Sequence, residues 1–216
     1  TLRWQNLIMD AAVKKKANGR LKKKLCSLQD STTKFEENTL DATQDWTKLI
    51  IDEKELAGIP EFAIQTASQE AQKHEQKGWL FTLKLPSYLA VMTHADSRDL
   101  RKEMYTAFAT RASDQGPNAG KWDNSEVMLD ILKTRLALAQ LLGFNNYAEY
   151  SLATKMVENT EAVLAFLNQL INAALEKAKQ EFEALKQFAH KELGIDDPHA
   201  WDIPYASEKL RHARFN

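Results

Sequence analysis

Histidine, glutamate and cysteine are the side chains of this sequence that could hold a metal ion or attack a substrate. A helical zinc site needs two histidines four positions apart, so that both imidazoles reach one metal, with a glutamate beside the first as general base. His74 is followed by Glu75, but Gly78 stands where the second histidine belongs. The remaining histidines have no partner at that spacing either: His94, His190, His199 and His212. We therefore predict no catalytic residue and no metal ligand set in this chain.

Other catalytic patterns are missing as well. The sequence has no GxSxG element, no phosphate-cradling glycine loop and no dinucleotide fingerprint. Acidic pairs such as Glu36-Glu37 fit solvated helix faces and caps better than an acid–base dyad. Cys26 lies on a predicted helical face, where a small buried hydrophobe is a better interpretation than a nucleophile. A single cysteine excludes an internal disulfide framework and fits a reducing compartment.

Charge and hydropathy exclude several classes of partner. With 29 basic and 30 acidic residues the formal charge is −1, which gives no overall attraction to nucleic acid or to an anionic membrane. The run from Lys14 to Lys24, KKKANGRLKKK, is the one concentration of positive charge, and it contains no aromatic residue. A solvated helix face is favoured over nucleic-acid or lipid binding there. No apolar run approaches the ~20 residues of a membrane span, and the N-terminus lacks a signal-peptide layout, so we expect a cytoplasmic protein.

Helices must position most side chains, because apolar residues recur every three or four positions along most of the chain. Two helices are predicted over 2–16 and 21–40, with a break or bend at Asn18-Gly19. Further helices are predicted over 60–78, 86–95, 97–112, 125–143, just after Asn145 or Asn146, over 160–193, and from Pro204 onward. The helix over 60–78 begins with Pro60, has one narrow face of alanines and has Gly78 as C′; the alanines are Ala63, Ala67 and Ala71. Asp96 is the expected N-cap of the helix over 97–112, and Asn159-Thr160 that of the long helix over 160–193.

Two short segments differ from the helical pattern. Residues 47–51 are partly β-branched, and 79–85 alternate between apolar and polar positions. We predict that they pair as one small antiparallel β ribbon. The expected fold class is therefore all-α, with αα-hairpins and one long helix, plus this ribbon. We expect a single helical region over 1–216, subdivided into N-terminal helices (1–44), ribbon plus helix (45–95) and helical core (96–216).

A polar segment with two glycines and a proline, Arg111–Met128, separates two helical runs. The spacing of Leu100 and Met104 before it, repeated by apolar residues after it, predicts an αα-hairpin. A plain hairpin needs about 2–8 linking residues, so a linker of about twelve with Trp122 in it favours a loop that packs against something. An ordered loop without a ligand is the preferred interpretation, and a ligand-contacting loop is the alternative.

Four segments of the sequence are distinctive: LDATQDWTKLI, LPSYLAVMTHADSRDLRKEMYTAFATRASDQGPNAGKWDNSEVM, LAQLLGFNNYAEYSLATKM and WDIPYASEK. Together they resemble the bacterial oligopeptidase A branch of the thimet-oligopeptidase family of zinc metallopeptidases. The resemblance is dense from about Lys34 to Glu208. It implies a cytoplasmic enzyme that cuts short peptides in a channel between two mostly helical lobes, with zinc as cofactor.

The same resemblance implies that this chain is a fragment without the catalytic region. In that family the HExxH helix and the other catalytic groups follow the segment that matches WDIPYASEK, so no catalytic residue is carried over. The fragment is expected to bind no zinc and to be inactive alone. Ala206 departs from the family pattern, which commonly has a second aromatic there. Low-ranked candidates for shaping the channel are Trp122, Asp123, Trp201, Asp202 and Tyr205, and structural anchoring is the preferred role for the two tryptophans.

A free-standing helical module that binds peptides or proteins without cutting them is the alternative function. If the chain is a piece of a larger helical protein, some helices must show apolar faces to water. We expect self-association of the fragment through those faces, or poorly ordered ends. Partners of the intact enzyme would be short peptides, with no nucleic acid and no membrane.

Overall fold

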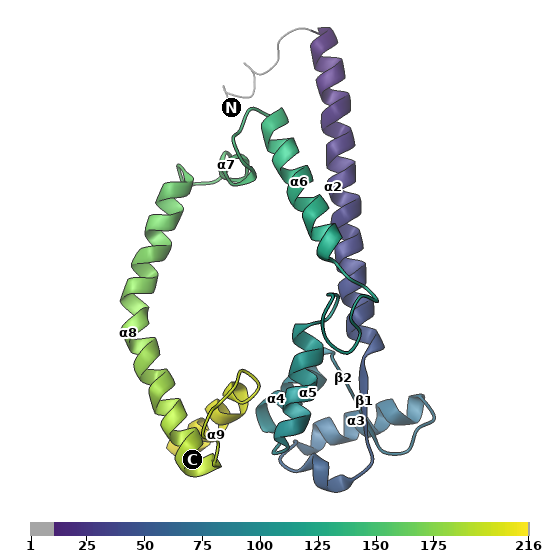
Figure 1. Ribbon diagram of the computed structural model, residues 1–216, viewed down its shortest axis with the longest axis vertical. Coiled ribbons are helices and arrows are strands. Elements are labelled where there is room, and N and C mark those ends of the chain that lie inside the picture. Colours follow the sequence, from purple (N-terminus) through teal and green to yellow (C-terminus); the bar gives the residue numbers. More distant parts are fainter. Residues whose placement is uncertain (1–10, 216) are drawn as a thin grey trace. The chain divides into compact units, whose positions relative to one another are not determined.

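The computed structural model describes the backbone of residues 11–215 and the side chains of residues 18–215. This part of the chain is mainly helical, with one two-stranded antiparallel sheet (Figure 1), which confirms the predicted fold class. With the labels of Figure 1, the elements are α2 (Ala11–Asp45), β1 (Thr47–Ile50), the 3-10 helix η1 (Glu53–Leu56), α3 (Glu61–Lys73), β2 (Trp79–Thr82), α4 (Leu85–His94), α5 (Arg98–Ala109), α6 (Ser125–Leu141), α7 (Tyr147–Leu152), α8 (Thr160–Leu193) and α9 (Ile203–Phe215).

The first helix is longer than the sequence pattern indicated. α2 is continuous from Ala11 to Asp45, so Asn18-Gly19 does not break the helix. Residues 2–10 of the predicted first helix lie outside the described residues. Glycine inside a helix costs only about 1 kcal/mol relative to alanine, which the flanking helical turns offset. Cys26, expected to be buried, is exposed on this helix.

The chain divides into two compact units. The first contains the chain up to Glu37 and Asn124–Asn172, and the second contains Asn38–Asp123 and the chain from Ala173. Both α2 and α8 contribute residues to each unit.

In the first unit, α6 lies alongside α2 (Figure 1). Ser31 Oγ donates to Asp130 Oδ2 at 2.6 Å, and Asn124 Nδ2 donates to the Phe35 carbonyl oxygen at 3.1 Å. Ile131 and Leu138 of α6 are buried, as their spacing predicted. Asn159 Oδ1 accepts from the Ala162 amide at 2.8 Å, which confirms the predicted N-cap of the long helix.

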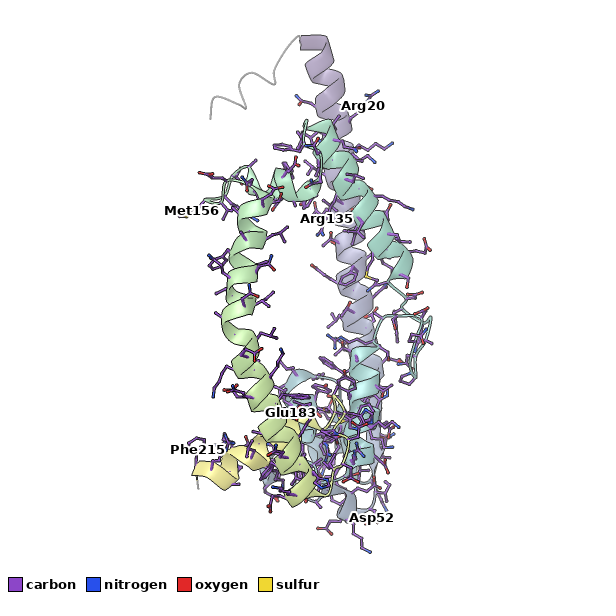
Figure 2. All side chains as sticks on the ribbon, turned by 60° about the vertical axis from the view of Figure 1, so that its left-hand side comes forward. Arg20, Asp52, Arg135, Met156, Glu183 and Phe215 are labelled. Atoms are coloured by element: carbon purple, nitrogen blue, oxygen red, sulfur yellow. The ribbon has the colours of Figure 1, made fainter. Side chains whose placement is uncertain are left out.

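Much apolar surface on the helices of this unit is exposed. Large side chains of α6 and of the first part of α8 are roughly half exposed: Met128, Leu129, Leu132, Leu136, Leu164, Phe166, Leu167, Leu170 and Ile171. Met156, labelled in Figure 2, is fully exposed between α7 and α8. None of the described helices is long and apolar enough to cross a membrane.

The second unit is built on the predicted ribbon. β1 and β2 pair antiparallel with Thr47 opposite Thr82 and Ile50 opposite Trp79, so the predicted pairing is confirmed over four residues of each strand. The alanines of α3 pack on β2, as the narrow face predicted: Ala63, Ala67 and Ala71. The core of this unit joins residues from α4 and α5 to the ribbon, among them Phe81, Val91, Met92 and Met104.

Three local predictions about helix ends in this unit are wrong. α3 starts after Pro60, which is its N-cap, and ends at Lys73 rather than at Gly78. Gly78 instead has φ +114°, and a Cβ there would overlap the Ile50 carbonyl oxygen, so the glycine permits close pairing at the start of β2. Ser97, not Asp96, caps α5, and its Oγ accepts from the Leu100 amide at 3.3 Å.

Candidate functional site

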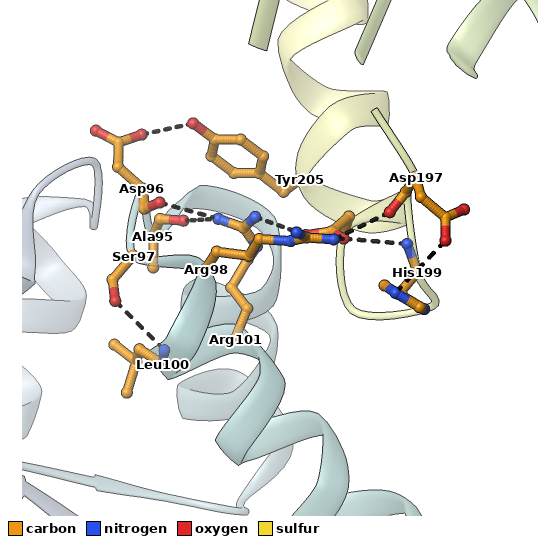
Figure 3. A network of polar contacts seen from close by, with 10 residues as sticks. Ala95, Asp96, Ser97, Arg98, Leu100, Arg101, Asp197, His199 and Tyr205 are labelled. Atoms are coloured by element: carbon orange, nitrogen blue, oxygen red, sulfur yellow. Dashed lines mark hydrogen bonds and ion pairs between the residues drawn. The ribbon is translucent and has the colours of Figure 1, made fainter. Parts of the chain in front are cut away.

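A buried carboxylate, Asp202, accepts hydrogen bonds from several residues of the second unit. Its partners Arg98, Arg101 and His199 are labelled in Figure 3. Arg98 Nε donates to both carboxylate oxygens at 3.1 Å, and its Nη2 donates to Oδ2 at 2.8 Å. Arg101 Nη2 donates to Oδ1 at 2.8 Å, and the His199 amide donates to Oδ2 at 3.0 Å. The carboxylate of Asp202 is 0 % exposed, so these donors replace water entirely.

Arg101 is the second fully buried charge of this network, at 1 % side-chain exposure. Besides Asp202, its Nη1 donates to the Ala95 carbonyl at 2.6 Å and to the Asp96 carbonyl at 3.2 Å. The ring of Tyr205 lies over the guanidinium, 4.0 Å from Cζ to ring centroid. Arg101 therefore ties the α4–α5 turn to the segment that begins α9.

Asp96 makes a second link between the same elements. Its Oδ1 accepts from the Tyr205 hydroxyl at 2.8 Å and from Lys209 Nζ at 3.2 Å. Asp202 directly precedes α9, while Tyr205 and Lys209 follow it by three and seven positions. This spacing places all three on one face of a helix, so the polar face of α9 docks on the α4–α5 turn.

The pKa values follow from these contacts. Burial raises the pKa of Asp202, but hydrogen bonds from Arg98 and Arg101 outweigh burial and hold that pKa below its ordinary value. Burial also raises the pKa of Asp96, but hydrogen bonds from Tyr205 and Lys209 outweigh burial, so this pKa too is lowered. Burial and the Asp96 carboxylate raise the pKa of Tyr205. At neutral pH both carboxylates are ionised and the phenol is protonated, so the network is a fixed set of charges rather than a proton-transfer site.

Trp201 packs on the surface beside this network. The His199 ring stacks on the indole at a centroid distance of 4.5 Å, and the Tyr105 ring lies 5.9 Å away at a tilt. The indole Nε1 is buried and has no hydrogen-bond acceptor among the residues that the structure describes. Partial burial against the core of the second unit gives Trp201 the contacts of an anchoring side chain.

Three of the five predicted site residues thus come together, namely Trp201, Asp202 and Tyr205. Trp122 and Asp123 lie elsewhere in the same unit, in the loop after the C-terminal end of α5, whereas Arg98 and Arg101 occupy its N-terminal end. The twelve residues of α5 span about 18 Å from one end of the helix to the other. Lys121 Nζ lies 4.2 Å from the Trp122 ring centroid and donates to Asp45 Oδ1 at 2.8 Å, so the loop is fastened to the end of α2.

The sequence interpretation missed Arg98, Arg101 and Lys209, and it gave Asp96 another role. A signal was present, because Arg101 falls between Leu100 and Met104 on the apolar face of a predicted helix. A charged residue at such a position must find a buried counter-ion. The sequence does not say which of the chain's acidic residues supplies it.

The histidines of the described chain do not form a cluster. His190 Nδ1 lies 2.8 Å from Asp196 Oδ1, His199 stacks on Trp201, and His212 Nε2 lies 3.0 Å from Glu208 Oε1. Within residues 18–215, no three histidine, cysteine, aspartate or glutamate side chains are placed to hold one metal ion. The described residues therefore do not fit a zinc site.

Comparisons with known proteins place this geometry in a family. The model of peptidase family M3 matches residues 91–216, which include every residue of the Asp202 network. Oligopeptidase A from Salmonella typhimurium is 54% identical over 184 residues, covering 85% of this chain and 27% of that protein. Oligopeptidase A from Escherichia coli is also 54% identical, with the same coverage. A probable cytosolic oligopeptidase A from Arabidopsis thaliana is 42% identical over 198 residues, covering 88% of this chain and 27% of that protein.

The chain therefore spans about a quarter of the length of these relatives. These matches confirm the resemblance to oligopeptidase A that the four sequence segments indicated. With more than half of its length matched by the family model, the chain belongs to peptidase family M3.

Proposed function

We propose that this chain is a non-catalytic helical part of a zinc metallo-oligopeptidase similar to oligopeptidase A, which hydrolyses short peptides in the cytoplasm. The observation that carries the proposal is the 54% identity to oligopeptidase A over 85% of the chain. The plant relatives are named as a cytosolic and an organellar form, so the cytoplasmic location of this protein is also a proposal.

The part played by this chain would be structural. The Arg98–Asp202–Arg101 cluster fixes the start of α9 on the α4–α5 turn with charge-assisted hydrogen bonds, which are stronger than neutral ones. In such an enzyme the bound zinc would activate a water molecule for attack on the scissile carbonyl. The sequence of 216 residues contains no HExxH motif, so we propose that the chain alone holds no zinc and cleaves no peptide.

Assays on two proteins made from the same gene test this proposal. The full-length product should cleave an internally quenched short peptide and lose that activity with a zinc chelator, whereas the 216-residue chain should show no cleavage above buffer. Elemental analysis of the dialysed chain should find much less than one zinc per molecule. Stoichiometric zinc or chelator-sensitive cleavage by the chain alone would contradict its proposed inactivity, and a full-length product without peptidase activity would contradict the enzyme assignment.

The helical binding module is the second candidate, and the exposed apolar side chains of α6 and α8 favour it. It predicts that the gene product ends near residue 216 and that the chain binds peptides that it does not cut. A full-length peptidase from the same gene would remove this candidate.

A further inference from the structure

A groove of about 500 Å³ opens in the second unit between η1, α3 and the first residue of β2. Its lining residues are Glu53, Leu56, Ala57, Glu61, Ile64, Gln65, Ser68 and Trp79. Asp52, labelled in Figure 2, directly precedes η1 and caps it by accepting from the Lys54 amide at 3.0 Å. A groove of this volume has room for one or two amino-acid side chains of a partner.

The floor of this groove is apolar and firmly held. Leu56 is buried in the core of the second unit, and Ile64 and Trp79 are partly buried against the same core. Trp79 is also fixed by its pairing opposite Ile50 in the ribbon. The groove therefore offers an aromatic and aliphatic surface that is formed before any partner arrives, which lowers the ordering cost of binding.

The rim is acidic and its charges are unbalanced. Glu53 and Glu61 are exposed, and neither has a basic partner in the part of the chain that the structure describes. The single polar contact at Glu61 is neutral, since Gln65 Nε2 donates to its Oε1 at 3.2 Å. Residues 51–72 contain five acidic side chains and one lysine, although the whole chain is nearly neutral.

The opposite side of α3 shows the contrast. Glu70 borders a second hollow of about 190 Å³, but its carboxylate is already neutralised by Lys73 at 2.8 Å and Lys84 at 3.7 Å. An incoming cation would have to displace one of these lysines there. At Glu53 and Glu61 it would meet exposed carboxylates that have no basic partner among the described residues.

We propose that the groove between η1 and α3 binds a lysine- or arginine-bearing peptide segment of a protein partner. The aliphatic stem of the basic residue would cover Leu56 and Ile64, which such stems do readily because only their heads need water. The cationic head would lie between the two carboxylates and close to the Trp79 ring, whose face attracts cations. This binding role goes beyond the proposed peptidase function and does not require it.

A peptide titration tests the proposal. The probe is acetyl-Lys-Leu-Lys-Leu-amide, its counterpart is acetyl-Glu-Leu-Glu-Leu-amide, and the reporter is the Trp79 indole resonance in ¹⁵N NMR spectra, assigned with Trp79→Phe. The basic peptide should shift this resonance in a saturable and salt-sensitive way, and the acidic peptide should not. In the double variant Glu53→Gln/Glu61→Gln, affinity should fall about five- to tenfold, which corresponds to two exposed ion pairs.

The double variant Glu158→Gln/Glu192→Gln is the matched control, because both residues are exposed carboxylates outside this groove and should leave the affinity unchanged. Glutamine preserves the size of each side chain, so the variants should fold, and their NMR spectra report this directly. No shift at millimolar basic peptide, equal binding of the acidic peptide, or equal losses in both double variants would overturn the proposal.

Discussion

Asp202→Asn is the substitution that most directly tests how the second unit is held together. The change keeps the shape of the side chain but removes the charge that neutralises Arg101 and Arg98. Arg98 is about half exposed and can turn to water, whereas Arg101 is almost completely buried and cannot. The variant therefore leaves one guanidinium charge buried without a counter-ion.

The expected loss follows from that buried charge. Removing one partner of a buried ion pair costs about 3–5 kcal/mol, since the remaining charge keeps its desolvation penalty. For a chain of this size, each kcal/mol lowers the melting temperature by about 2–4 °C. We expect Asp202→Asn to lower the free energy of unfolding of the second unit by about 3–5 kcal/mol and its melting temperature by roughly 6–20 °C.

Tryptophan fluorescence during urea unfolding is the suitable assay. Four of the five tryptophans, Trp46, Trp79, Trp122 and Trp201, lie in the second unit, so the signal reports mainly on that unit. Glu103→Gln is the matched control, because it also converts an ion-paired carboxylate into an amide. Glu103 of α5 pairs with Lys48 of β1 at 2.6 Å. Both of its side chains are partly exposed, and such pairs contribute about 0–1 kcal/mol.

The reasoning fails if Asp202→Asn destabilises the unit no more than Glu103→Gln does. That result would mean that water reaches Arg101 or that the arginine finds another acceptor. A large loss in both variants would instead point to a general sensitivity of α5 to charge.

Four further outcomes are expected. Gly78→Ala should destabilise the chain by about 1–3 kcal/mol in urea unfolding, because Gly78 has a positive φ and lies close to the Ile50 carbonyl oxygen. Gly19→Ala within α2 should instead stabilise the chain by about 0.5–1 kcal/mol. Equal effects of the two variants would contradict the close approach at Gly78. Hydrogen bonds from Arg211 lower the pKa of Glu208 to about 2, and the pKa values of Asp96 and Asp202 are also lowered. These ionised carboxylates therefore stabilise the fold above the unfolded-state pKa of about 4, and this stabilisation is lost as the pH falls below it. Glu208→Gln should therefore reduce the dependence of stability on pH at acid pH. Sedimentation at tens of micromolar should show self-association through the exposed apolar residues of α6 and α8, reduced by Leu132→Glu, while a strictly monomeric species would contradict it. In a full-length protein with the proposed peptidase activity, Trp201→Ala should lower the melting temperature and leave residual kinetics normal, because the indole has the contacts of an anchor. A lower kcat/KM with an unchanged melting temperature would contradict this and favour a role in substrate binding.

Local patterns in the sequence were sufficient for most of the fold. Apolar residues at helical spacing predicted the helices, since one face of each must be buried, and the long helix from Thr160 was placed with its cap. The period-two pattern at 79–85 predicted a strand that pairs with 47–51, because strands bury alternate side chains. Sequence segments that resemble oligopeptidase A over most of the chain indicated the family.

Tertiary structure decided the roles of individual polar and glycine residues. Asp96 and Ser97 are both suitable N-cap residues for α5. Ser97 is the cap, because the Asp96 carboxylate instead accepts from Tyr205 and Lys209, more than a hundred positions away. Gly78 reads as a helix end, but its positive φ serves the approach to Ile50 across the ribbon. Asp202 and Tyr205 were picked out by resemblance alone, and their partners Arg98 and Arg101 appear only after α9 folds onto the α4–α5 turn. Helix and strand periods are local properties of a chain, whereas the partner of a buried charge is set by which segments meet in space.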